Sequence, residues 1–70
     1  MSFYIQLVGR SRTIFYASSK ISIPGGVSTM YEQKKEFRTR EDATMFSERY
    51  LCLGYVILIR ETNNEEEELL

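Results

Sequence analysis

The sequence predicts a small α+β domain: a mainly antiparallel sheet of three to four strands with one helix on one face, in the order β-β-(β)-α-β. The first half of the chain contains short β-branched and aromatic runs, the second half contains one capped amphipathic helix, and an apolar strand follows that helix directly. Seventy residues leave room for one domain, which we place at 1–61, with 62–70 as an acidic C-terminal tail.

The first two strands are predicted to form a hairpin. The run FYIQLV at residues 3–8 alternates, with one face formed by Phe3, Ile5 and Leu7. The run TIFYAS at residues 13–18 is β-branched and aromatic, and the intervening GRSR contains Gly9, which tolerates a positive φ. Two such runs separated by a short polar segment are typical of a hairpin.

A third extended segment is predicted after Pro24-Gly25-Gly26. These three residues match neither the phosphate-binding Walker spacing nor the dinucleotide-binding spacing of glycines, so they predict a turn. Residues 27–37 alternate as a strand does, but their centre is polar on both faces. A helix over 29–38 competes with the strand, because MYEQKKEF has high helix propensity.

The helix is predicted over residues 40–53. Thr39 has the spacing of an N-cap with Asp42 at the third helical position, and Gly54 is a natural stop. The face expected to pack against the sheet, with Phe46 and Tyr50 beneath Ile57 or Ile59, is formed by Ala43, Phe46, Tyr50 and Leu53.

The last strand, YVILI at residues 55–59, is apolar on both faces, which predicts a central strand covered on both sides. One helix covers only one face. We therefore expect Val56 and Leu58, or the alternating set, to lie at an interface with a second copy or a partner, most simply in a two-fold dimer.

The inventory of reactive side chains argues against an enzyme. The chain has no histidine, and Cys52 is its only cysteine, so neither a disulfide nor an ordinary zinc site can form within it. Cys52 near the helix C-terminus is interpreted as a small buried or half-buried apolar residue, and Glu41 and Asp42 have a role at the helix N-terminus. We predict no cofactor and no metal.

Basic residues form two stretches that could bind a ligand or partner. The candidate binding residues are Arg10, Arg12, Tyr31, Lys34, Lys35 and Arg38. Together they suit a protein partner, the phosphates of a nucleotide-like ligand held between subunits, or single-stranded nucleic acid. Nucleic acid is disfavoured because Glu32 and Glu36 interrupt the second stretch and the isoelectric point is about 5.4.

The body (residues 1–61) and the C-terminal tail carry net charges of opposite sign. Residues 1–61 carry nine basic and six acidic side chains, a net +3, and Glu65 to Glu68 add −4. Four like charges in a row predict a solvated tail, with shielding of a basic surface or imitation of phosphates as alternatives. No apolar run reaches membrane-spanning length and the N-terminus lacks the pattern of a secretory leader, so a soluble, cytoplasmic protein is expected.

The segment FRTREDATMFSERYLCLGYVILI combines a strand end, a capped helix, a glycine and an apolar strand. In this pattern it resembles the C-terminal halves of small phage-encoded host-takeover and anti-defence proteins. The resemblance covers about one third of the chain and carries over no site residues. It implies a viral protein that inhibits a host protein of the defence or transcription machinery by stoichiometric binding.

Overall fold

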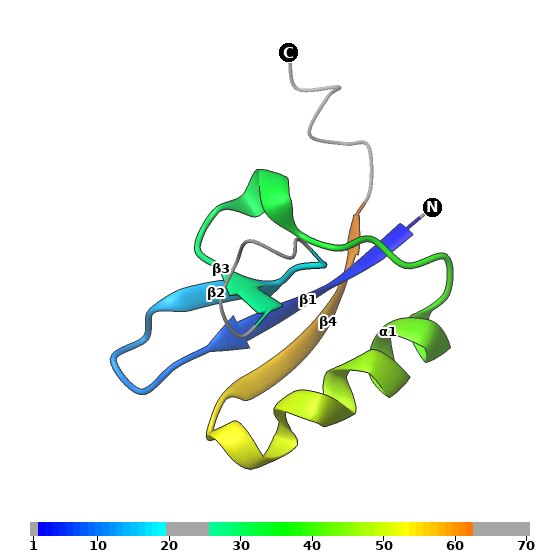
Figure 1. The fold of residues 1–70 in the computed structure, drawn as a ribbon. Coiled ribbons are helices and arrows are strands. Elements are labelled where there is room, and N and C mark those ends of the chain that lie inside the picture. Colours follow the sequence, from blue (N-terminus) through cyan, green and yellow to red (C-terminus); the bar gives the residue numbers. More distant parts are fainter. Residues whose placement is uncertain (1, 20–25, 63–70) are drawn as a thin grey trace.

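The computed structural model describes residues 2–19 and 26–62, in which four strands form one open antiparallel sheet (Figure 1). The spatial order is β3-β2-β1-β4. The strands are β1 (Ser2–Val8), β2 (Ile14–Ala17), β3 (Val27–Ser28) and β4 (Val56–Thr62). One helix, α1 (Arg40–Ser47), crosses one face, so the predicted α+β class is confirmed.

The hairpin of β1 and β2 is confirmed. Val8 lies opposite Ile14, and the connecting turn is closed by the Gly9 amide, which donates to the Thr13 carbonyl at 2.8 Å. The Arg12 amide donates to the Gly9 carbonyl at 3.0 Å, and Arg12 itself has a φ of 67°. The predicted turn at Gly9 therefore places its left-handed residue at Arg12.

The core lies between α1 and the face of the sheet formed by the odd-numbered residues of β1, β2 and β4. Ile5, Leu7 and Ala17 are fully buried there, and Ala43 of α1 covers them. The half-buried members that pack against this cluster are Phe3, Phe15, Val27, Phe46, Tyr55, Ile57 and Ile59. This arrangement confirms that the helix packs on the same side as Ile57 and Ile59.

The predicted caps of the helix are also confirmed. The Thr39 hydroxyl accepts a hydrogen bond from the Asp42 amide at 3.0 Å, and Gly54 has a left-handed φ of 87°. The α-helix itself ends at Ser47 and continues as a 3₁₀ helix, η3 (Glu48–Leu53). Because a 3₁₀ helix has three residues per turn, Leu53 leaves the predicted buried face and is 61% exposed.

The prediction of a third strand over residues 27–37 is wrong for most of its length. Only Val27 and Ser28 pair with β2, and a 3₁₀ turn, η2 (Tyr31–Gln33), follows. The Ser28 hydroxyl accepts from the Met30 amide at 3.0 Å and donates to the Gln33 side chain at 2.6 Å, and these two hydrogen bonds stabilise the turn in place of strand pairing. The competing helix over 29–38 is equally wrong. The chain returns to the sheet at Lys35, whose amide donates to the Ala17 carbonyl at 2.8 Å, and Phe37 then bridges Phe3.

The last strand is not central. β4 pairs only with β1 among the described strands, and lies at the edge of the sheet. The amide and the carbonyl of Phe3 both hydrogen-bond with Phe37, on the side of β1 away from β4. Glu61, which lies opposite Phe3, therefore directs its own amide and carbonyl toward the free edge of β4. Because hydrogen-bonded and non-hydrogen-bonded pairs alternate along an antiparallel pair, the backbone groups of Ile59 also face that edge. The Arg40 guanidinium donates to the Ile59 carbonyl at 3.3 Å and thereby covers part of that edge.

Tyr50 links the helical layer to the start of β3. Its side chain is 2% exposed, and its hydroxyl donates to the Gly26 carbonyl at 2.9 Å. The same carbonyl accepts from the Ser18 amide at 2.8 Å. The rest of the predicted Pro24-Gly25-Gly26 turn and the acidic tail beyond Thr62 lie outside the described residues, and β4 extends one residue past the predicted body.

Candidate functional site

The face of the sheet opposite α1 is formed by the even-numbered residues of β1 and β4. At its Ser2 end, Tyr4, Tyr16 and Tyr31 form a cluster in which ring centroids lie 5.4 to 6.0 Å apart. η2 brings Tyr31 onto the two strand tyrosines, so the segment after β3 covers part of this face. Lys34 places its ammonium 3.8 Å from the Tyr31 centroid and 3.4 Å from the Glu36 carboxylate.

The other end of this face is apolar and open. Ile14, Val8 and Val56 lie side by side across β2, β1 and β4, and Leu58 follows on the same face of β4. Val56 is 60% exposed, Ile14 42% and Leu58 38%, and Val8 is half-buried. We call Val8, Ile14, Val56 and Leu58 the apolar patch. Its contact with solvent marks a surface suited to an apolar partner.

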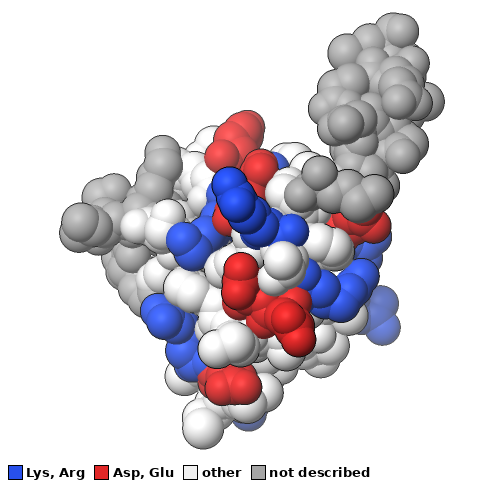
Figure 2. All heavy atoms as spheres, turned by 90° about the vertical axis from the view of Figure 1, so that its right-hand side faces the viewer, with Lys and Arg blue, Asp and Glu red and all other residues white. Residues whose placement is uncertain are grey.

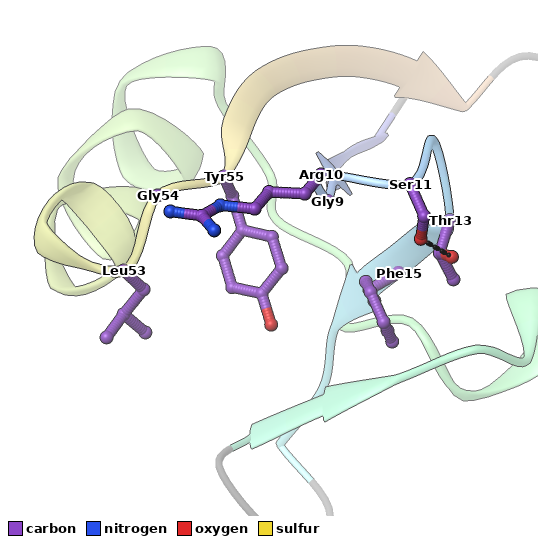
Figure 3. A pocket seen from close by; sticks show the side chains of 8 residues that line it. All are labelled: Gly9, Arg10, Ser11, Thr13, Phe15, Leu53, Gly54 and Tyr55. Carbon is purple, nitrogen blue, oxygen red and sulfur yellow. Dashed lines mark hydrogen bonds between the residues drawn. The ribbon is translucent and has the colours of Figure 1, made fainter.

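A hollow of about 340 Å³ opens between the β1–β2 turn and the start of β4 (Figure 3), and its aromatic wall belongs to the face of the sheet that packs under α1 rather than to the face of the apolar patch. Phe15 and Tyr55 form its wall, with ring centroids 5.6 Å apart in an edge-to-face arrangement. Arg10 reaches over it from the turn, pointing toward Tyr55 and Gly54 in Figure 3. The hollow is lined by Gly9, Arg10, Ser11, Thr13, Phe15, Leu53, Gly54 and Tyr55.

The hydroxyl groups at the hollow are fixed by each other. Ser11 Oγ and Thr13 Oγ1 lie 2.8 Å apart, so one hydroxyl donates to the other and one hydroxyl hydrogen is left to donate outward (Figure 3). None of the described residues that line the hollow is acidic. The hollow therefore combines a cation, a hydroxyl donor and aromatic surface, which suits an anion attached to an apolar group.

The predicted binding residues do not converge on one site. Arg10 and Arg12 belong to the turn beyond the Val8 end of β1, whereas Tyr31 and Lys34 pack over Tyr4 at the opposite end. Lys34 is only 9% exposed at its side chain, since it lies on the aromatic rings.

The other two predicted binding residues point elsewhere. Lys35 lies on the helix side, with its ammonium 5.4 Å from the Phe37 centroid and 5.6 Å from the Phe46 centroid. Arg38 is exposed in the loop before α1. Among the residues that the structure describes, the predicted basic residues therefore form no continuous stripe interleaved with tyrosines within one chain.

Charges of both signs share the surface around α1. Figure 2, which shows the right-hand side of Figure 1, has Lys, Arg, Asp and Glu side chains interspersed over this side. Nucleic-acid binding uses a basic surface that follows the phosphate backbone. This side of the molecule has no such single-sign surface among the residues that the structure describes.

The Cys52 thiol and the Tyr50 hydroxyl differ in their exposure to solvent. Cys52 is exposed, which corrects the expectation of a buried or half-buried thiol, because the 3₁₀ geometry of η3 turns it outward. Burial raises the pKa of the Tyr50 hydroxyl above its ordinary value, with a smaller opposing effect of the Arg49 charge. Within the described ranges, no group of three or more His, Cys, Asp or Glu side chains could hold a metal, and no helix is long and apolar enough to cross a membrane.

The aromatic and apolar members of the site were missed by sequence reasoning. Phe15, Leu53 and Tyr55 were assigned to the core or left without a role. A sequence feature that points to them is their position: Tyr55 directly follows Gly54, and Phe15 is the second residue of β2, close to the turn that contains Gly9. Side chains at strand ends beside turns lie where the covering layer ends.

No family model matches the chain, and comparisons with curated proteins and with solved structures give no match either.

Proposed function

We propose that the chain is a small, non-enzymatic binding protein that acts stoichiometrically on another protein through the apolar patch. The observation that supports this function is the exposure of Ile14 on β2 and of Val56 and Leu58 on β4, on either side of β1 and away from the layer formed by α1. A contiguous exposed apolar surface rimmed by polar residues is typical of protein interfaces.

The charge around the apolar patch favours a partner protein over a second copy. Arg10 and Arg12 lie in the adjoining turn, and Arg60 follows Leu58 on the same face of β4. Two copies joined face to face through this patch would bring these cationic rims together, whereas a partner with an acidic rim would complement them. A second copy of the chain, which the sequence predicts, is the competing partner for the same surface.

The face of the sheet is a better candidate than its free edge. Arg40 already donates to the Ile59 carbonyl at that edge, and such a side chain opposes the addition of another strand. The resemblance to phage host-takeover and anti-defence proteins supports a host protein as the partner and inhibition in the host cytoplasm as the outcome.

Binding of a nucleotide-like ligand or of single-stranded nucleic acid receives less support. Both need several cations around one ligand, and Arg10, Lys34 and Lys35 point away from one another in this chain. An oligomer that assembles these residues from different subunits would keep the nucleotide alternative open. Sedimentation of the purified protein with and without added nucleotide tests that alternative.

The proposed function is tested by site-specific cross-linking. A photoreactive amino acid at position 58 should attach to one partner protein in a bacterial lysate, whereas the same group at position 45 should not. Met45 is the matched control because it is apolar and 68% exposed on α1, away from the apolar patch. Leu58→Lys should abolish partner binding and Met45→Lys should preserve it.

Two results would contradict this function. One is equal cross-linking from positions 58 and 45. The other is a stable homodimer, measured by sedimentation, that Leu58→Lys dissociates, since the patch would then be occupied by a second copy.

A further inference from the structure

We infer that the hollow binds a small molecule that carries one aromatic ring and one carboxylate. This site is separate from the proposed function, because the aromatic wall of the hollow lies on the face of the sheet under α1 and the apolar patch lies on the opposite face. Four features of the hollow support the inference: its open aromatic wall, its single cation, its hydroxyl donor and its size.

The wall is open because the helical layer ends beside it. The 3₁₀ helix η3 stops at Leu53, and the left-handed Gly54 then turns the chain toward β4. Phe15 and Tyr55 are consequently half-buried rather than covered. A Cβ at Gly9 would lie 3.4 Å from the Phe15 ring and 3.9 Å from the Tyr55 ring. Because Gly9 has no side chain, this surface of the two rings is available to a ligand.

The two rings suit an aromatic ligand. Phe15 and Tyr55 meet edge to face, with centroids 5.6 Å apart. Aromatic rings in proteins prefer edge-to-face or offset contacts at about 4.5 to 7 Å, so a ligand ring against this wall continues the same arrangement. Arg10 points toward Tyr55 in Figure 3, and a guanidinium is itself attracted to aromatic faces.

The cation and the hydroxyl suit one carboxylate. The Arg10 guanidinium presents paired N–H groups that match the two oxygens of a carboxylate. No described residue forms an ion pair with Arg10, and no described lining residue is acidic. The bonded pair of Ser11 and Thr13 hydroxyls leaves one hydrogen to donate to the same anion.

The size and the charge of the hollow favour a small carboxylate over a nucleotide. The volume of about 340 Å³ is near the lower limit of ligand pockets. Arg10 is the only cationic side chain among the described residues that line the hollow. A nucleotide with several phosphates would need further cations, and Lys34 and Lys35 lie on other parts of the molecule.

A free compound fits this combination better than a protein side chain. No standard side chain carries both an aromatic ring and a carboxylate. A polypeptide presents the two groups on one residue only where an aromatic residue is C-terminal. A peptide that ends in phenylalanine therefore distinguishes the two sources of the same chemistry.

The turn supplies a matched control. Arg10 and Arg12 share the turn closed by the Gly9 and Thr13 backbone groups, and both are exposed, but only Arg10 lines the hollow. Arg10→Gln and Arg12→Gln therefore remove the same charge from the same turn. A general electrostatic attraction predicts equal effects of the two substitutions, whereas a site at the hollow predicts an effect of Arg10→Gln alone.

The experiment uses the full chain labelled with ¹⁵N and three probes: phenylacetate, its neutral analogue phenylacetamide, and acetate, which lacks the ring. Phenylacetate at about 10 mM should shift the amide signals of residues 9–15 and 53–56, with a Kd of about 1 mM, as expected for a ligand of this size. Phenylacetamide and acetate should each bind about tenfold more weakly, because each lacks one of the two recognised groups.

The variants test which residues make the site. Arg10→Gln should weaken phenylacetate binding about tenfold, the loss expected for one charge-assisted contact, and Arg12→Gln should leave it unchanged. Leu58→Lys, on the opposite face of the sheet, should also leave it unchanged. A folded Leu58→Lys variant that no longer binds phenylacetate would contradict a separate site.

Other outcomes would also overturn the inference: no localised shifts with phenylacetate, equal binding of phenylacetamide or acetate, or equal losses in the two arginine variants. Displacement of phenylacetate by inorganic phosphate at equal concentration would show that the site recognises phosphate. Binding of N-acetyl-glycyl-glycyl-phenylalanine ten times tighter than that of phenylacetate would assign the hollow to a protein C-terminus instead. None of these results bears on the proposed function, which stands or falls with cross-linking from position 58.

Discussion

Gly26 and Gly54 both adopt a positive φ, 71° and 87°, but their surroundings differ. A Cβ at position 54 would have no heavy atom within 4 Å, whereas at position 26 it would lie 3.3 Å from the Tyr50 hydroxyl oxygen. Gly54→Ala should therefore lower the free energy of unfolding by about 1 kcal/mol, the cost of a left-handed non-glycine residue.

Gly26→Ala should cost more than Gly54→Ala, because it adds crowding against a buried tyrosine to the same backbone penalty. Urea denaturation of both variants measures the difference in unfolding free energy. Equal losses would mean that the Tyr50 contact adjusts without cost.

The Tyr50 hydroxyl gives a second prediction at the scale of single residues. Burial raises its pKa above the ordinary value of about 10, so the folded state keeps the proton at a pH where the unfolded chain releases it. The free energy of unfolding should consequently be unaffected by this group below pH 10 and should fall as the pH rises above 10.

Tyr50→Phe is the variant that isolates this effect. It should lose about 1 kcal/mol at neutral pH, because the hydrogen bond to the Gly26 carbonyl is removed. It should also show a smaller decline above pH 10 than the wild-type chain, which thermal melts at several pH values measure. Parallel declines in the two proteins would contradict the assignment to Tyr50.

At the scale of elements, the N-terminus of α1 depends on one side chain. Thr39 accepts from the Asp42 amide at 3.0 Å, and removal of such a cap commonly costs about 1 kcal/mol. Thr39→Ala should lower the midpoint of urea unfolding by a corresponding amount. Thr39→Ser retains the hydroxyl and should restore most of the stability; a serine variant as unstable as the alanine variant would point to the threonine methyl group instead.

The elements that sequence reasoning predicted correctly are those specified by local chemistry. The alternation of β1, the cap at Thr39 and the left-handed glycine at position 54 each depend on neighbours within a few residues. The segment 29–37 could not be predicted in this way. Its conformation depends on the packing of Tyr31 against Tyr4 and Tyr16, which is a contact between distant parts of the sequence. This packing replaces strand pairing for the polar centre of the segment.

The candidate site was partly predictable for the same reason. The two-sided apolar pattern of β4 predicted that Val56 and Leu58 lie on a face not covered by the helix, and both are exposed there, but it also suggested a central strand. The sequence pattern of one strand does not reveal where that strand lies in the sheet. A central strand that is covered on both faces and an edge strand with an exposed apolar face both have apolar residues on their two faces. The hollow depends on the meeting of the β1–β2 turn with Gly54 and Tyr55, which only the fold brings together.

At the scale of the whole molecule, a charge introduced on one face of β4 should unfold the domain, whereas a charge on the other face should leave the domain folded. Ile57 packs with the core beneath α1, so Ile57→Lys should unfold a domain of this size, whose core supplies only about 3 to 5 kcal/mol. Val56 is 60% exposed on the opposite face, and Val56→Lys should change the free energy of unfolding by about 0.5 kcal/mol or less.

Circular dichroism and partner binding should separate these two variants. Val56→Lys should keep the wild-type spectrum and lose binding, and Ile57→Lys should lose both. A folded Ile57→Lys variant would show that the helical layer does not cover this face of β4.

The central position of β1 also has a consequence for how fast the molecule forms. β1 pairs with β2 nearby, but its longer pairing joins Val8 to Val56 and Ser2 to Thr62, so nearly the whole described chain lies between the partners. This loop must close before β4 contributes, and proteins dominated by such non-local pairings fold in milliseconds to seconds rather than microseconds. Until that closure, Ile57 and Ile59 have no partner strand, and the newly made chain carries its most apolar segment unprotected.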